Sequence, residues 1–433
     1  EVYHIDDFEH PENSRYSYAI LQDKKRINFY PTEPIDLRSG AEVTATTYLL
    51  ESSAITDTTQ AGNFSVVTAA PPIEATGDQK TLILLIDFLD SIPSTNTPAE
   101  IYDSVFNGQF QKFYAEQSYG KISFSGGVKG WYTLPRNQGG SNNNCHPPDW
   151  PSGNSETTRL ILDNNVDLSQ YGHLVLVADS PCLGGYSSLG KIAVLVGDQS
   201  FNLSVSIVFI PQLEFFWPWR GANFYPFPWT ILNYILSHEM GHGLGILHAK
   251  GWNCGENVLR GDCRSEEYGN SFDQMGSGDQ ALHFNSFYKE QLGWIPPNET
   301  IQISSSGRYS LGPLELSSSN KKLAKIQSPY SASTTLYLEY RRGIGFDRKL
   351  NDPTLFSNQN GLLINKIIYS PNSPLLDFPF LLDMQPTILL WFQDISLAAL
   401  NSTTSKFVDT KSGISLGPII SNDGSSIAFN VEI

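Results

Sequence analysis

Apolar and polar residues alternate differently in the middle of the chain than at its two ends. In the middle, continuous apolar runs predict buried strands at residues 82–88, 174–178 and 192–196, with a shorter strand at 121–124. Apolar residues at helical spacing predict helices at 99–117, near 156–162 and over about 230–244. This alternation is typical of a mixed sheet with helices packed on it.

Both ends of the chain favour strands. Short alternating segments such as 42–48 lead to an Ala/Pro/Gly-containing linker at 69–77. Beyond residue 297, the segments 309–311, 336–340, 361–366 and 425–431 are typical of a β-sandwich. Because 433 residues exceed one ordinary core, we expect an α+β chain of three domains: residues 1–76, 77–299 and 300–433.

The helix predicted at 230–244 carries a metal-binding motif. His238, Glu239 and His242 begin the pattern HExxHxxGxxH, which Gly245 and His248 complete. Residues four apart share a helix face, so His238 and His242 can bind one ion. Had the helix continued, His248 would lie roughly 15 Å from His238 along its axis. The helix must therefore end and turn back.

Glycine suits that turn, because Gly245 can adopt the left-handed backbone of a helix C-terminus without steric cost. Three histidine ligands leave one zinc position for water, as in catalytic sites. Glu239 is expected to act as general base and not as a ligand. The alternative is a helix whose histidines are ordinary core or surface residues.

These residues resemble the zinc-binding motif of the metzincin peptidases, a clan that adds a methionine-containing turn below the metal. Met275, in the glycine-rich segment 268–278, matches that turn, and residues 284–292 resemble the helix that follows it. Looser likenesses at 116–126, 130–134, 284–287 and 292–294 are most similar to the gametolysin-like family. The resemblance covers mainly residues 78–299 and implies a secreted zinc endopeptidase. In some relatives, a tyrosine two residues after this methionine assists the zinc or the oxyanion. Ser277 stands at that position here, so we assign no tyrosine to this role.

The composition of the chain limits the classes of partner that it is expected to bind. A formal net charge of −16 opposes binding to nucleic acid or anionic membranes through bulk charge. Every apolar run is interrupted before the ~20 residues that a membrane helix needs. We expect a monomer that binds an extended polypeptide substrate. The chain begins at Glu1 without an apolar leader, which suggests processing.

Four cysteines and four glycosylation patterns favour a secretory route. The expected disulfides are Cys254–Cys263 and Cys145–Cys182, although four cysteines allow three connectivities. Free buried thiols are the alternative. Acceptor sequences for N-glycosylation occur at Asn63, Asn202, Asn298 and Asn401.

Other features support no firm assignment. Residues 1–76 form either an accessory module, which we favour, or an inhibitory pro-domain; a thiol switch is excluded there because Cys145 is the first cysteine. Aromatic and proline residues at 215–219 and 224–229 line a cleft or fill a core. Lone histidines and clustered acids receive no catalytic or calcium-binding role: His146, His173, His283, Asp262, Glu266, Glu267 and Asp273.

The expected reaction is zinc-assisted peptide hydrolysis, with Glu239 as proton acceptor and then donor. Extended substrate would add to an edge strand of the sheet. Two alternatives remain: a latent precursor whose N-terminal segment must first be removed, and a zinc-containing adhesion protein that keeps the protease fold without turnover. Retention of Glu239 argues against the second.

Overall fold

The structure is a computed structural model of residues 1–433. It describes the chain except residues 8–14, 23–24, 33–34, 36, 51–52, 69–71, 73, 92–95, 139–147, 181–183, 211–230, 277–281, 319, 330, 332, 353–355, 357–360, 369–377, 385, 387–397 and 402–405.

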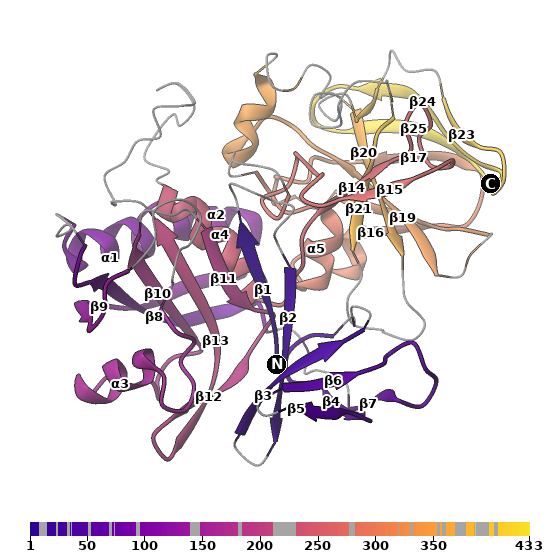
Figure 1. The fold of residues 1–433 in the computed structure, drawn as a ribbon. Helices are drawn as coiled ribbons and strands as arrows, with labels where there is room; N and C mark the ends of the chain where they lie inside the picture. Colours follow the sequence, from indigo (N-terminus) through magenta and orange to yellow (C-terminus); the bar gives the residue numbers. More distant parts are fainter. Residues whose placement is uncertain are drawn as a thin grey trace. The chain divides into compact units, whose positions relative to one another are not determined.

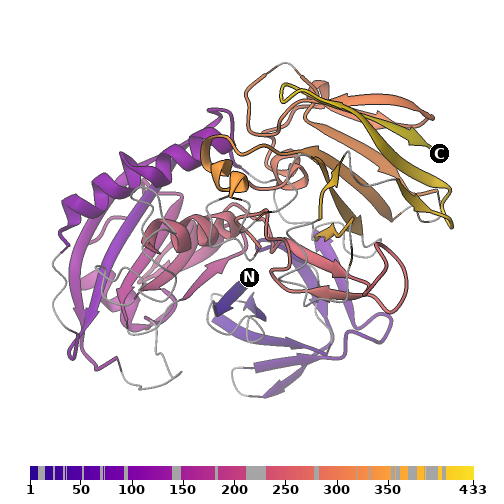
Figure 2. The same cartoon turned by 90° about the horizontal axis from the view of Figure 1, so that it is seen from above.

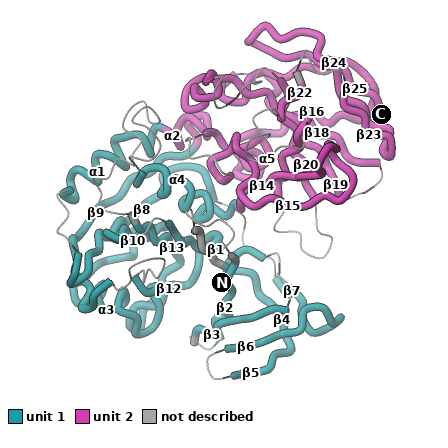
Figure 3. The backbone as a smooth tube through the Cα atoms, turned by 45° about the horizontal axis from the view of Figure 1, so that its top comes forward, with its two compact units in different colours: residues 1–112, 122–246 teal, residues 113–121, 247–433 magenta. Residues whose placement is uncertain are grey.

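Two compact units make up the chain (Figure 3). Unit 1 contains Glu1–Lys112 and Ile122–Ile246, and unit 2 contains Phe113–Lys121 and Leu247–Ile433. This division differs from the three domains expected from the sequence, whose boundaries stay a prediction. The units are described separately below.

Unit 1 is built on one eleven-stranded sheet in the order β5-β6-β3-β2-β1-β11-β13-β10-β8-β9, with β12 paired to β13. Its strands from the second half of the unit are β8 (Gly77–Phe88), β9 (Ile122–Leu134), β10 (His173–Asp179), β11 (Gly184–Ser188), β12 (Ile192–Val196) and β13 (Gln199–Ile210).

The centre of this sheet is parallel and buried. Strands β9, β8, β10 and β13 pair in parallel, and β10 is buried along its whole length. Parallel strands covered on both faces need continuous apolar sequence, which the runs at 82–88 and 174–178 supply. On one face Leu82, Leu84 and Ile86 pack with Leu160 and Ile161 of α3 (Glu156–Asp163) in one hydrophobic core.

The helix expected at 99–117 is two helices, α1 (Pro98–Phe106) and α2 (Gln109–Gln117). Thr97 and Glu100 form a capping box that fixes the start of α1. The break falls at Gly108, where a Cβ atom would lie 2.1 Å from the backbone oxygen of Ser104. Only glycine permits so close an approach, and periodicity alone does not reveal it.

Most strands of residues 1–68 continue the same sheet. The strands of this segment are β1 (Val2–Asp7), β2 (Arg15–Gln22), β3 (Lys25–Pro31), β4 (Glu42–Ala45), β5 (Tyr48–Leu50), β6 (Ser53–Thr56) and β7 (Phe64–Thr68). The link is β1, which pairs with β2 on one side and with β11 on the other (Figure 1). Strands β4 and β7 form a small sheet of their own. The β-rich character expected for this segment is thus observed.

Unit 2 contains two sheets that share a hydrophobic core. The larger has the order β15-β14-β21-β20-β19-β18-β16, with β22 paired to β20, and the smaller β17-β25-β24-β23. Orange and yellow ribbons mark its later strands in Figure 2. The elements are β14 (Lys250–Asn253), β15 (Arg264–Glu266), α5 (Ser286–Gln291), η3 (Pro297–Glu299), β16 (Thr300–Ile303), β17 (Gly307–Leu311), β18 (Leu323–Gln327), β19 (Thr334–Tyr340), η4 (Gly345–Asn351), β20 (Gly361–Ile368), β21 (Pro379–Leu382), β22 (Leu400–Asn401), β23 (Phe407–Asp409), β24 (Ile414–Asn422) and β25 (Ile427–Glu432).

The described chain is therefore rich in sheet and mixes strands with helices, as an α+β protein does. Three of the C-terminal strand segments expected from the sequence fall within β17, β19 and β20, and the fourth, 425–431, overlaps β25. None of the described helices combines the length and hydropathy needed to span a membrane.

Candidate metal centre

Helix α4 (Ile231–Gly243) carries the first half of the motif. Every residue from Leu232 to Gly243 is buried, so this is a core helix and not an amphipathic surface helix. His238 and His242 share one face of it, as their spacing predicts, with ring centroids 5.0 Å apart. The helix therefore delivers two imidazoles to one buried place.

The chain turns directly after α4. Gly245 has φ +93°, in the left-handed region, and its backbone N–H donates to the oxygen of His242 at 2.7 Å. The N–H of Ile246 donates to the oxygen of Gly241 at 3.2 Å, which satisfies a second carbonyl at the helix end. This is the turn expected from the sequence at Gly245.

The turn brings the third histidine of the motif back to the first two. One ring nitrogen from each of His238, His242 and His248 lies within 4.8 Å of the others, and all three residues are fully buried. The ligands come from one continuous stretch of chain, so the geometry is set by α4 and the turn that ends it.

Two of the imidazoles are oriented by hydrogen bonds. His242 Nδ1 lies 2.8 Å from the backbone oxygen of Ile246, and His248 Nδ1 lies 2.7 Å from Oε1 of Glu267. A carbonyl can only accept, and an ionised carboxylate likewise, so each Nδ1 carries the proton. The lone pair is then on Nε2, the tautomer that a metal ligand requires.

This donor set fits a divalent transition metal. Neutral imidazole suits zinc, copper, iron and nickel, so the ligands alone do not select zinc. Three protein ligands leave coordination positions for water or substrate, as in catalytic zinc sites. Zinc is the ion expected from the full motif.

Glu239 is fully buried, as are His238 and His242 of the same helix. Its carboxylate packs against Gly185 of β11, where a Cβ atom would lie 2.1 Å from Oε1. Ser187 of the same strand donates from Oγ to the backbone oxygen of Glu239 at 2.9 Å. Strand β11 thus positions the side chain that is the candidate general base.

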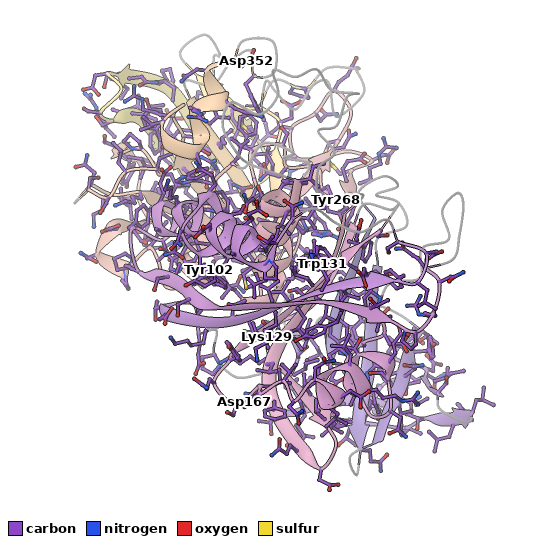
Figure 4. The ribbon with its side chains drawn as sticks, turned by 90° about the vertical axis from the view of Figure 1, so that its left-hand side faces the viewer. Tyr102, Lys129, Trp131, Asp167, Tyr268 and Asp352 are labelled. Carbon is purple, nitrogen blue, oxygen red and sulfur yellow. A yellow bond between two sulfur atoms is a disulfide. The ribbon has the colours of Figure 1, made fainter. Side chains whose placement is uncertain are left out.

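Glu267 is an ionised partner for His248. Burial alone would raise the pKa of Glu267, but hydrogen bonds from His248 and Lys250 and the charge of Lys250 hold it well below its usual range. Lys250 Nζ lies 2.7 Å from Oε2 of Glu267. The ring of Tyr268, labelled in Figure 4, lies 4.0 Å from the imidazole of His248 between centroids. Together these residues fix the third imidazole.

Met275 is buried in the segment that the resemblance identifies as a turn below the metal. Its backbone oxygen accepts from the N–H of Ala249, directly after His248, at 2.9 Å. Tyr288 of α5 donates from its hydroxyl to the oxygen of His248 at 2.9 Å. The segment around Met275 and helix α5 therefore both hold the chain at the third histidine.

Asp273 organises the same segment. Its Oδ1 accepts from the N–H of Met275 at 2.7 Å, and its Oδ2 accepts from the backbone and side-chain nitrogens of Asn285, each at 2.6 Å. Burial raises the pKa of Asp273 to about 7, against the opposing effect of these hydrogen bonds. The residue is a buried connector and not a surface charge.

A buried group of charges surrounds Arg341 in unit 2. Its guanidinium donates to Asp347 from Nε at 2.7 Å and lies 3.3 Å from both Glu315 and Glu339. Glu339 accepts in turn from the N–H of Ser286, at the start of α5. Arg341 thus lies at the centre of contacts that reach the helix next to the Met275 segment.

Two lone histidines have structural partners. His283 Nε2 lies 2.9 Å from Oε1 of Glu116, and its Nδ1 lies 2.9 Å from Nζ of Lys289. His173 is buried in β10 and contacts Gln79 and Ser204. His146 lies outside the described residues, as do Ser277 and the aromatic segments at 215–219 and 224–229.

One expected disulfide is present. Cys254 and Cys263 are joined, which confirms that pairing, whereas Cys145 and Cys182 lie outside the described residues. Asn202 and Asn298 are exposed and Asn63 is partly exposed, so their side chains are accessible. The side chain of Asn401 is not among those described.

Sequence reasoning missed three supporting residues. The sequence assigns no role to Glu267, Asp273 or Gly185. Glu267 is partly exposed and Asp273 is buried, and the sequence around these acids carries no signal that separates them from the other acids nearby. A Gly-Gly pair at 184–185 within a strand does indicate a close approach, which is the signal that could have identified Gly185.

Comparison of the chain with protein-family models finds no match, and comparison with curated proteins finds no relative. The site's own geometry therefore carries the functional argument.

Proposed function

We propose that this chain is a secreted zinc-dependent endopeptidase with a metzincin-like catalytic region, most similar to the gametolysin-like family. The observation that carries the proposal is the convergence of His238, His242 and His248, with Glu239 adjacent to the first of them. Three histidines and a neighbouring carboxylate are the parts that water-mediated hydrolysis needs.

When bound, zinc supplies a Lewis acid that lowers the pKa of a water molecule and polarises the scissile carbonyl. Glu239 takes the proton from that water as its oxygen attacks the carbonyl carbon. Glu239 then gives the proton to the leaving amine nitrogen as the C–N bond breaks. No covalent enzyme intermediate is required, and the carboxylate is restored at the end.

The chain's other residues prepare this step. Glu267 and the oxygen of Ile246 keep the protons of His248 and His242 on Nδ1. Gly185 leaves the space in which the Glu239 carboxylate lies. The Cys254–Cys263 disulfide and the exposed Asn-Xaa-Ser/Thr sites support an oxidising, secretory environment.

The test compares the full chain with Glu239→Gln on fluorescein-labelled casein. We expect hydrolysis to fall at least about 100-fold in the variant, because the carboxamide cannot accept the proton. Metal analysis should still find one zinc per chain, since Glu239 is not a ligand. His242→Ala should instead lose bound zinc, and a chelator should abolish cleavage by the unaltered chain.

Casein cleavage that persists in Glu239→Gln would refute the assignment of activity to this motif. A zinc-loaded chain without activity, before and after limited proteolysis near residues 69–80, would favour the non-catalytic adhesion protein. Activity only after that proteolysis would select the latent precursor.

A further inference from the structure

Strand β11 has neighbours on both sides, and one of them comes from the start of the chain. In the described sheet, β11 pairs with β13 and, antiparallel, with β1. The remaining strands of the sheet beyond β1 all belong to residues 1–68. If β1 left, β11 would become the edge of the sheet formed by β11, β13, β10, β8 and β9.

That edge lies beside the candidate general base. Gly185 of β11 contacts the carboxylate of Glu239, and Ser187 donates to its backbone oxygen. Two residues beyond the strand, the N–H of Gly190 donates to the oxygen of His242 at 3.0 Å. Strand β11 therefore runs beside the motif segment of α4. A strand that pairs with β11 lies about 4.8 Å from it, which is one strand spacing.

The register places β1 across this part of β11. Asp6 is the partner of Gly185 and Asp7 is the partner of Gly184. Both strands and α4 belong to unit 1, and Figure 1 shows β1 next to β11. An extended stretch of chain thus occupies the backbone hydrogen-bonding edge of the strand that contacts Glu239.

We propose that β1 is an internal competitor, which occupies the edge of β11 with which an extended polypeptide substrate of the proposed peptidase would pair. The inference rests on the proposed peptidase function. Backbone pairing tolerates almost any sequence, so one edge can accept either β1 or a substrate strand. Because β1 is tethered, its effective concentration is in the millimolar range, so it excludes substrate until it is displaced.

The anchoring of β1 lies at its first residues. Val2 is buried, its oxygen accepts from the N–H of Leu189 at 2.8 Å, and Ser39 Oγ hydrogen-bonds to its nitrogen and oxygen at 2.9 and 2.7 Å. These contacts hold the start of β1 at one end of β11. They offer a way to loosen the strand without altering β11 or α4.

The first experiment locks the strand reversibly. In the full chain, Ile5→Cys with Tyr186→Cys joins a pair of facing positions of β1 and β11. The oxidised form should hydrolyse fluorescein-labelled casein at least tenfold more slowly than the same variant after reduction. The matched control, Ile20→Cys with Ile27→Cys, joins β2 to β3 and should change less than twofold under the same conditions.

The second experiment loosens the strand. Val2→Asp should raise casein hydrolysis at least fivefold, and Ser39→Ala provides a milder variant should the first fail to fold. The seven-residue peptide Glu-Val-Tyr-His-Ile-Asp-Asp, added in trans, should inhibit the loosened variant. Independently of activity, amides 184–188 should exchange hydrogen faster in the variant and regain protection when the peptide is added.

The outcomes separate the two proposals. If the oxidised lock cleaves casein as fast as the reduced form, β1 does not block substrate and the inference is wrong, while the peptidase stands. If no form cleaves casein although the peptide restores amide protection, the edge binds polypeptide and the proposed activity fails.

Discussion

At the scale of single residues, the site depends on which nitrogen of each histidine carries its proton. His242 and His248 are fixed in the Nδ1–H tautomer by a carbonyl and by a carboxylate. The carboxylate of Glu267 also contributes charge, which strengthens the donor character of His248 towards a metal. Glu267, one of several clustered acids in the sequence, therefore has a specific role.

Glu267→Gln should weaken zinc binding by about tenfold. Loss of the group that hydrogen-bonds to the other ring nitrogen of a metal-bound histidine costs about 10- to 100-fold in metal affinity. The glutamine can still accept a hydrogen bond, so the smaller effect is expected. Competition with a chromogenic chelator measures the dissociation constant. The control is Glu266→Gln, since Glu266 pairs with Arg264 and not with a histidine. Equal affinities in the two variants would contradict this role.

At the scale of elements, buried polar side chains tie the central strands together. His173 of β10 contacts Gln79 of β8 and Ser204 of β13, and Gln79 Nε2 donates to the oxygen of Thr76. Gln79 therefore presents its oxygen to His173, so Nε2 donates and Nδ1 accepts. A neutral imidazole therefore bonds to both neighbouring strands.

Acidification should destabilise unit 1 through His173. Burial, aided by the charge of Lys191, lowers the pKa of His173 to about 3, from 6.5. The unfolded chain therefore binds the extra proton between these values, so stability is lost as the pH falls from about 6.5 towards 3. The loss between pH 6.5 and 4.5 should be about 2 kcal/mol.

Urea unfolding at the two pH values measures this loss. His173→Gln should be less stable at pH 6.5 but should lose about 2 kcal/mol less than the unaltered chain on acidification. An unchanged pH dependence in His173→Gln would show that other groups control acid unfolding.

At the scale of the whole molecule, each unit holds its own part of the motif by contacts that are distant along the chain. Within unit 1, β11 supports Glu239. Within unit 2, Glu267 and α5 hold His248, and the Met275 segment holds the adjacent Ala249. Within unit 2, Arg341 connects η4 and β19 to the start of α5 through Asp347 and Glu339. Residues of β19 and η4 are thus part of the support for α5.

Arg341→Met should destabilise unit 2 by about 3 kcal/mol or more, because it leaves buried carboxylates without their cation. Denaturant unfolding followed by tryptophan fluorescence measures the change. Arg342→Met is the matched control: this residue is partly exposed and donates to the oxygen of Gly424, so about 1 kcal/mol is expected. A loss in Arg341→Met no larger than in the control would refute the role of the buried charges.

Prediction from sequence succeeded where local spacing carries the information. The strands at 82–88, 174–178 and 192–196 lie in β8, β10 and β12, and the helix near 156–162 is α3. The prediction failed at Gly108, which divides the helix expected at 99–117. The helical spacing of apolar residues is the same before and after Gly108, so it does not reveal the break. Strand β13 was not predicted, since its polar positions such as Ser204 and Ser206 interrupt the apolar run.

The sequence alone determined the three histidines, the adjacent glutamate and the turn at Gly245, because all of them lie within one helix and its end. The helical repeat and the left-handed backbone of glycine are local properties that a short stretch of chain carries by itself. Only the tertiary structure decided that Glu267 orients His248, that Gly185 makes room for Glu239, and that β1 covers β11. These contacts join residues distant along the chain, so no periodicity or spacing records them.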